Sequence, residues 1–342
     1  MKLFWLAVAL GTAAIVGRAQ AQLKFNPNQV AILRWYQANL TANFPNGVTY
    51  GAAFDGVNLW LTGGGSLVDK VRASDLASTR FLVCEQIDCA ELTGIAFDGA
   101  NVWIADEKYP SIIKLRASDD AVLGRFAVGG QPAGVAFDGA NIWVTNAGSN
   151  NVIKLRATDG ALLGTFAVGL QPAGVAFDGA NIWVTNTLSN NVTKLRASDG
   201  VVLGTFPVFS APVAAAFDGV NIWVANVGSD NVTKLRASDG TVLGKFVVGH
   251  EPVGVVFDGA NIWVANKGSN NVTKLQASNG AKLGTFPLSY APTGSMAFDG
   301  ANIWVGVFGP PPRRHVETID RNEAVLVCGR VGDGGDCRAR RS

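Results

Sequence analysis

The chain has 342 residues, of which 48% are hydrophobic and 16% are charged, and it contains 41 glycines. This composition is typical of a folded, turn-rich protein and excludes an intrinsically disordered chain. The formal net charge is only +2, too small a basic excess for a phosphate-binding surface, which argues against nucleic acid as a partner.

Residues 1–21 have the features of a secretory signal peptide. Lys2 supplies positive charge, residues 3–17 are apolar, and Ala19-Gln20-Ala21 fits the small-x-small pattern that signal peptidases cut. The apolar run is about 15 residues, which is short for a membrane span, although an uncleaved anchor is the alternative. Cleavage would leave 26 basic and 26 acidic residues and no segment that could cross a membrane as a helix. We therefore expect a protein that is secreted, periplasmic or on the cell surface.

Residues 22–50 resemble the second half of a unit that recurs further along the chain. The matching residues are Val30, Leu33, Arg34, Phe44 and Gly47, which stand where Val152, Leu155, Arg156, Phe166 and Gly169 stand. This N-terminal half-repeat is predicted to close a ring by pairing with the last inner strands, and so to shield open strand edges. The alternative closing segment is the hairpin in residues 309–342, which also ends in a basic tail.

Residues 51–308 consist of seven copies of one unit. Its Phe-Asp-Gly motif recurs at a spacing of 40 residues in the middle of the chain, and each copy is followed by a tryptophan. The phenylalanines are Phe54, Phe97, Phe137, Phe177, Phe217, Phe257 and Phe298, and the tryptophans are Trp60, Trp103, Trp143, Trp183, Trp223, Trp263 and Trp304. A fixed period of this length indicates a repeat architecture.

Each unit contains four short apolar segments separated by turn residues. The segments are about five residues long and rich in Val, Ile, Phe and Trp, and Asp-Gly or Asn-Asn turns separate them, which predicts antiparallel strands. Seven such units predict an all-β, seven-bladed β-propeller with four antiparallel strands per blade. Gly134 and Ala136 would keep the innermost strand slim, and the tryptophans would pack between blades, with sugar stacking as the alternative.

The four cysteines form two pairs that are close in sequence. An exported protein favours the disulfides Cys84–Cys89 and Cys328–Cys337. A single zinc bound by all four is the alternative, but the spacings differ from the CxxC pattern of zinc knuckles.

The functional residues are expected where the copies differ, on the face formed by two sets of loops. These are the loops from strand 4 to strand 1 of the next blade (4–1 loops) and from strand 2 to strand 3 (2–3 loops). The candidate ligand-binding residues are Asp106, Glu107, Lys108, Tyr109, Gln131, Gln171, Phe209, Lys267 and Tyr290. Asn146, Asn186, Asn226 and Asn266 end the second strands; they either present amides to a ligand or cap their own turns.

The chain contains no complete catalytic motif. Only His250-Glu251, in a 4–1 loop and expected opposite Asp106 and Glu107, suggests a general base beside carboxylates that hold a divalent cation. Such an arrangement could support an elimination reaction. Outside this alternative we expect no cofactor.

The stretch from Trp143 to Gly179, with its WVTN and QPAGVAFDG segments, resembles the YVTN-type and NHL-type repeats of exported β-propeller proteins. The resemblance covers most of residues 30–305 and implies the propeller fold; families of this kind include envelope scaffolds, ligand sensors and a few lyases. More distantly, the chain resembles streptogramin B lyases, propellers with a histidine and a glutamate on the rim. Only His250 and Glu251 carry over, and most second strands here end in Asn rather than in the Glu of that family.

We expect a monomeric binding module that recognises a ligand, or an envelope or extracellular protein, through its top-face loops. A metal-assisted carbon–oxygen lyase is the alternative, and a structural protein of the cell envelope is the third possibility.

Overall fold

The computed structural model describes the backbone of residues 43–45, 49–63, 65–83, 91–308, 313–320, 325–327 and 338–340, and the side chains of residues 50–63, 65–83 and 91–308. The predicted signal peptide, most of residues 22–50 and all four cysteines lie outside these residues, so the predictions made for them stay predictions. In the described part of the chain, no helix is long and apolar enough to span a membrane.

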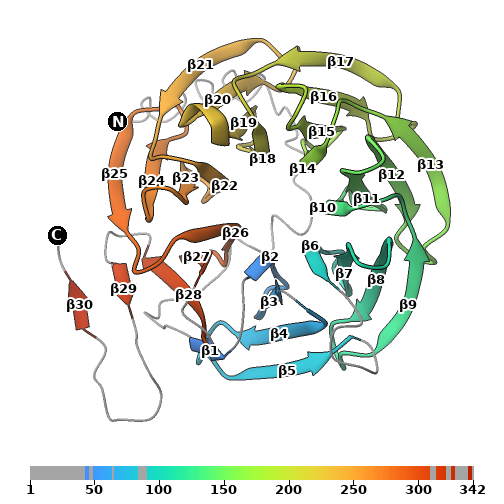
Figure 1. Ribbon diagram of the computed structural model, residues 1–342, viewed down its shortest axis with the longest axis horizontal. Coiled ribbons are helices and arrows are strands. Elements are labelled where there is room, and N and C mark those ends of the chain that lie inside the picture. The colour runs from blue at the N-terminus through green and yellow to red at the C-terminus, as the bar shows by residue number, and fades with distance from the viewer. Residues whose placement is uncertain are drawn as a thin grey trace, which may run out of the picture.

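Seven antiparallel sheets form a ring, which confirms the predicted propeller (Figure 1). Blades 1 to 6 each have four strands, arranged in chain order from the centre outward. Their first strands are β2 (Thr49–Phe54), β6 (Leu92–Phe97), β10 (Pro132–Phe137), β14 (Pro172–Phe177), β18 (Pro212–Phe217) and β22 (Pro252–Phe257). Their second strands are β3 (Asn58–Gly63), β7 (Asn101–Asp106), β11 (Asn141–Asn146), β15 (Asn181–Asn186), β19 (Asn221–Asn226) and β23 (Asn261–Asn266).

The outer half of each blade is equally regular. The third strands are β4 (Leu67–Arg72), β8 (Ser111–Arg116), β12 (Asn151–Arg156), β16 (Asn191–Arg196), β20 (Asn231–Arg236) and β24 (Asn271–Gln276). The fourth strands are β5 (Ser78–Leu82), β9 (Val122–Ala127), β13 (Leu162–Ala167), β17 (Val202–Pro207), β21 (Val242–Val247) and β25 (Lys282–Pro287). One short 3₁₀ helix, η1 (Val227–Ser229), occupies the 2–3 loop of blade 5.

Blade 7 is assembled from both ends of the chain. Its first three strands are β26 (Pro292–Phe298), β27 (Asn302–Val307) and β28 (Arg313–Asp320), and the outer side of the sheet carries β1 (Asn43–Pro45), β29 (Val325–Val327) and β30 (Arg338–Arg340). Both candidate closing segments contribute: β28 of the C-terminal hairpin pairs with β27 and supplies the third strand, and β1 of the N-terminal half-repeat pairs with β28 on its outer side. A hairpin between neighbours in sequence closes a short loop, which costs less conformational entropy than recruiting the distant N-terminus.

The Asp-Gly-x-Asn-x-Trp motif forms the turn between the first two strands and fixes the tryptophan. In blade 3, Oδ1 of Asp138 accepts the backbone N–H groups of Ala140 and Asn141, and its Oδ2 accepts the indole N–H of Trp143 at 2.8 Å. Gly139 has φ of 99°, a conformation that favours glycine. The aspartate–indole bond recurs in every blade, so the motif recurs because one carboxylate organises both turn and core.

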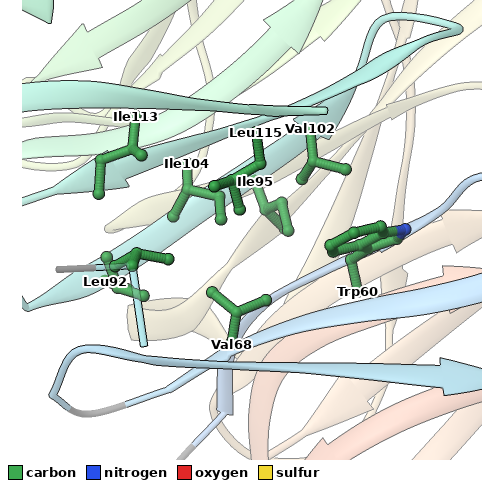
Figure 2. Close-up of a cluster of buried hydrophobic side chains, with 9 residues drawn as sticks. Trp60, Val68, Leu92, Ile95, Val102, Ile104, Ile113 and Leu115 are labelled. Carbon is green, nitrogen blue, oxygen red and sulfur yellow. The ribbon is translucent and has the colours of Figure 1, made fainter. Parts of the chain in front are cut away.

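The hydrophobic core lies between blades rather than within them. All seven tryptophans are at most 1% exposed, and each packs against the next blade in the ring, which confirms the packing role and rules out sugar stacking on them. Figure 2 shows this for the first junction, where Trp60 and Val68 of blade 1 face apolar side chains of blade 2. At the centre, a Cβ on Gly174 would lie 2.7 Å from the carbonyl oxygen of Val213, so blades converge too closely there for a side chain.

A lysine on the third strand joins each of blades 1 to 5 to the next blade, and sequence analysis did not predict this role. In blade 3, Nζ of Lys154 lies over the Trp143 ring and donates to the carbonyl oxygens of Ala197 and Ser198 in blade 4 at 2.6 and 3.0 Å. Lys70, Lys114, Lys194 and Lys234 make the equivalent bond to the following blade. The signal was present in the sequence as a lysine that recurs directly before a buried leucine or valine of the third strand.

Candidate binding face

In blades 2 to 6, where the structure describes them, the 4–1 and 2–3 loops are bonded to each other and form one layer, which we call the top-face collar. In blade 3 the backbone N–H groups of Ala147 and Gly148 donate to the carbonyl oxygens of Gln131 and Gly130 at 2.8 and 3.0 Å. Neighbouring blades are joined as well, because Oδ1 of Asn150 accepts the N–H of Gln171 at 2.8 Å. The expectation that these loops share one face is therefore confirmed, and the collar is held mainly by backbone bonds that allow side chains to vary.

The asparagines that end the second strands do not present amides to a ligand. Asn146, Asn186, Asn226 and Asn266 have no exposed surface. Their Nδ2 groups donate to the side-chain oxygen of the first residue of the third strand, as Asn146 does to Asn151 at 2.7 Å. These residues close the turn beneath the collar, as the alternative interpretation held.

Asp106 occupies the same position in blade 2 and is likewise buried, with no exposed surface. Nη1 of Arg125 donates to its Oδ2 at 2.8 Å, and its Oδ1 accepts the backbone N–H of Glu91 at 3.0 Å. The interpretation of Asp106 as a rim residue that contacts a ligand was wrong, because Asp106 is the last residue of β7 and its side chain lies beneath the loops, bonded to Arg125 and Glu91.

The rest of the blade 2 loop does lie on the collar. Lys108 and Tyr109 are exposed, with Nζ of Lys108 6.0 Å from the tyrosine ring centroid, and Glu107 is half-buried. Burial, together with the negative charge of Glu91, raises the pKa of Glu107 above its ordinary value. Two carboxylates therefore stand side by side on this blade.

The remaining candidates are distributed around the ring and do not converge on one point. Gln131 and Gln171 are exposed, each with φ near 50°. Lys267 places Nζ 5.6 Å from the Phe308 ring centroid, and Tyr290 packs against the core between blades 6 and 7. Phe209 is 37% exposed, and Nζ of Lys245 lies 4.3 Å from its ring centroid.

An apolar patch on blades 4 and 5 was missed in part by sequence analysis. Leu170 and Leu188 are 53% and 66% exposed, and the N–H of Leu188 donates to the carbonyl oxygen of Leu170 at 3.2 Å. The 4–1 loop that holds Phe209 is bonded to the same 2–3 loop, because Oδ1 of Asn190 accepts the N–H of Ala211 at 2.9 Å. We call Leu170, Leu188 and Phe209 the leucine–phenylalanine patch. Its signal in the sequence was large apolar residues at positions where several other units have glycine or serine.

His250 has an acidic partner that sequence analysis did not identify. Its Nδ1 lies 2.9 Å from Oδ2 of Asp230, whose Oδ1 accepts the N–H of Glu251 at 2.9 Å. These hydrogen bonds, first that from Glu251 and then that from His250, lower the pKa of Asp230. The imidazole is 77% exposed. The predicted grouping of His250 with Asp106 is wrong because Asp106 is enclosed in blade 2, and the described residues contain no group of three His, Cys, Asp or Glu able to hold a metal.

Comparisons with known proteins identify the fold and not a family. No protein-family model matches the chain, and no curated protein matches it in sequence. Among solved structures, one titled "Streptogramin B lyase structure" has a TM-score of 0.67 at 17% identity and covers 81% of this chain and 96% of its own. A hydrazine synthase of Kuenenia stuttgartiensis has a TM-score of 0.66 at 16% identity, covering 84% and 99% of the two chains.

A chain from a mitotic checkpoint complex gives a TM-score of 0.72 at 11% identity, covering 83% of this chain and 96% of that one. Proteins of such different kinds, at such low identity, share an architecture with this chain and not a demonstrated function. The chain is thus a β-propeller whose structural neighbours include a streptogramin B lyase.

Proposed function

We propose that this protein is an exported binding module that recognises a partner through its top-face collar. The observation that carries the proposal is the leucine–phenylalanine patch. Phe209 replaces the glycine found at Gly129, Gly169 and Gly249, and Leu188 replaces the glycine found at Gly148, Gly228 and Gly268. The scaffold folds with glycine at these positions, so folding does not require the large side chains.

Exposed apolar side chains that gather on one site favour binding. Leaving a leucine or phenylalanine in water forgoes about 1.5–3 kcal/mol of burial free energy, which a partner would recover by covering it. The proposal includes export, for which the signal-like residues 1–21 are the support.

The test replaces the patch with the residues that other units carry. The triple variant Leu170→Gly, Leu188→Gly, Phe209→Gly and the wild type are immobilised and exposed to envelope and medium extracts of the producing cells. Bound components are then identified by quantitative mass spectrometry and titrated in purified form by calorimetry. We expect at least one saturable binder of the wild type that the triple variant fails to retain.

The matched control removes exposed leucines outside the patch. Leu123 and Leu163, 41% and 43% exposed on the fourth strands, are changed to serine. Loss of the binder in this control, or equal retention by wild type and triple variant, would refute a specific site on blades 4 and 5.

A lyase activity is the second candidate, and the His250–Asp230 pair favours it. A carboxylate 2.9 Å from one ring nitrogen fixes the orientation of an imidazole and leaves the other nitrogen to act as a general base. The similarity to a streptogramin B lyase is the further support, at the level of fold. The test incubates the protein, with and without added divalent cation, with a streptogramin B antibiotic. Ring opening without uptake of water, abolished in His250→Ala, would establish elimination; an unchanged antibiotic would reject this candidate.

A further inference from the structure

The ion pair between Arg125 and Asp106 contacts Val83, at the end of blade 1, and Glu91, just before blade 2. Nη1 of Arg125 donates to Oδ2 of Asp106 at 2.8 Å, and Nη2 of the same side chain is 3.4 Å from the carbonyl oxygen of Val83. On the other border, the N–H of Glu91 donates to Oδ1 of Asp106 at 3.0 Å. That oxygen also accepts the N–H of Tyr109, in the 2–3 loop of blade 2, at 3.4 Å.

Other blades of the same chain fold without this pair. The positions of Asp106 and Arg125 are taken by an asparagine and a threonine in three blades: Asn146 and Thr165, Asn186 and Thr205, and Asn266 and Thr285. Among the described residues, the Oδ1 atoms of these asparagines accept no hydrogen bond, so these oxygens bind no backbone N–H of the loops, unlike the carboxylate of Asp106. The strand pairing is nevertheless the same in register, as the second-to-third strand ladders show.

The Asp106–Arg125 pair is expected to add little to the free energy of unfolding. Asp106 has no exposed surface and the Arg125 side chain is 31% exposed, so both groups lose hydration on folding. The attraction within a buried pair is largely offset by this desolvation, and neutral replacements that fit are often as stable. The distinguishing contribution of the pair is therefore geometric. Its two side chains bind three backbone groups from separate segments: the carbonyl group of Val83 and the N–H groups of Glu91 and Tyr109.

We propose that Asp106 and Arg125 are positioning residues for the blade 2 sector of the top-face collar. They hold Glu91 and the loop that presents Glu107, Lys108 and Tyr109, so that these side chains keep a fixed arrangement. The biological purpose of this arrangement rests on the proposed binding function, whereas the effect of the pair on the loop can be measured on the protein without any partner.

The experiment replaces Asp106 and Arg125 with the residues that other blades of the chain carry at these two positions. The double variant Asp106→Asn, Arg125→Thr reproduces the residues of blades 3, 4 and 6 in the full chain. We expect its thermal midpoint to match the wild type, while hydrogen exchange at the amides of Glu91 and Glu107–Tyr109 becomes at least tenfold faster. The equivalent amides of blade 3, Ala147–Ser149, are the internal control and should not change.

A second variant separates the charge from the geometry. Arg125→Lys keeps a cation beside Asp106, but one ammonium cannot reproduce the two directed bonds of a guanidinium to Asp106 and Val83. We expect an intermediate acceleration at the same amides. Unchanged exchange in the double variant would overturn the proposal, and so would a large fall in midpoint with faster exchange in every blade, because the pair would then be structural.

These outcomes are independent of the binding test. Exchange is measured on the protein alone, whereas the proposed function is tested by the leucine–phenylalanine patch variants. Local acceleration together with no binder would leave the positioning role established and remove the proposed function.

Discussion

Trp143 donates its indole N–H to Oδ2 of Asp138 at 2.8 Å, and this bond joins the turn between the first two strands of a blade to the largest side chain of its core. Because all seven blades repeat it, we infer that the architecture depends on a polar contact to a buried indole as well as on apolar packing. Its removal in one blade is a direct test.

We expect Asp178→Ala to lower the free energy of unfolding by about 2–4 kcal/mol, since the buried Trp183 indole and the turn amides lose a charged acceptor. Equilibrium urea unfolding measures the change. The control Asp199→Ala alters an exposed turn of the same blade and should cost less than half as much. Equal effects of the two variants would contradict the role of the motif.

Lys194→Met should destabilise the junction between blades 4 and 5 by about 1–3 kcal/mol, because two carbonyl groups lose their donor and the Trp183 ring loses its cation. Thermal unfolding followed by tryptophan fluorescence gives the shift. Lys282→Met, on an exposed fourth strand, is the matched control, and a stability equal to wild type in both variants would show that the inter-blade bond contributes nothing.

Removing residues 22–45 should leave the ring formed but less stable. This truncation takes away β1, which pairs Asn43 with His315 and Pro45 with Arg313, and so bares the outer edge of β28. We expect a lower thermal midpoint and faster hydrogen exchange confined to Arg313–His315. Exchange that accelerates equally in blades 3 and 4 would mean that the N-terminal segment stabilises the whole ring directly.

Acid should weaken the turns between third and fourth strands. Hydrogen bonds from the backbone and side chain of Thr241, followed by the neighbouring Arg236, lower the pKa of Asp239 from 3.8 to about 2. A carboxyl with a lower pKa in the folded state contributes stability that is present above pH 4 and is lost as the pH falls through 2. Asp239→Asn, which imitates Asn279 of blade 6, should remove part of the decline in urea midpoint between pH 4 and pH 2. An identical decline in both proteins would show that this group does not titrate as described.

The disulfide prediction for Cys328 and Cys337 has a specific test. Both residues lie outside the described part of the chain, but their neighbours Val327 and Arg338 are cross-strand partners. We expect a single disulfide-linked peptide containing both cysteines after non-reducing digestion of the oxidised protein. Free thiols at both positions, or a link to Cys84 or Cys89, would reject the pairing.

The Asp-Gly turns, the short apolar segments and the period of 40 residues determined the fold from the sequence by itself. Each of these features acts over a few residues: Asp138 bonds Ala140, Asn141 and Trp143, all within five positions. Repetition then amplifies the signal sevenfold, and units that cannot bury their own faces must stack.

The tertiary structure decided what each polar side chain does. Asp106 and His250 look alike in sequence as titratable residues near loops, yet one is enclosed with Arg125 and the other is exposed beside Asp230. Lys154 reaches a carbonyl group 43 residues away, and blade 7 takes its third strand from β28 while β1 from the other end of the chain pairs outside it. Contacts of this kind depend on which segments the closed ring brings together and on which side of a strand end faces solvent, and neither is encoded in local spacing.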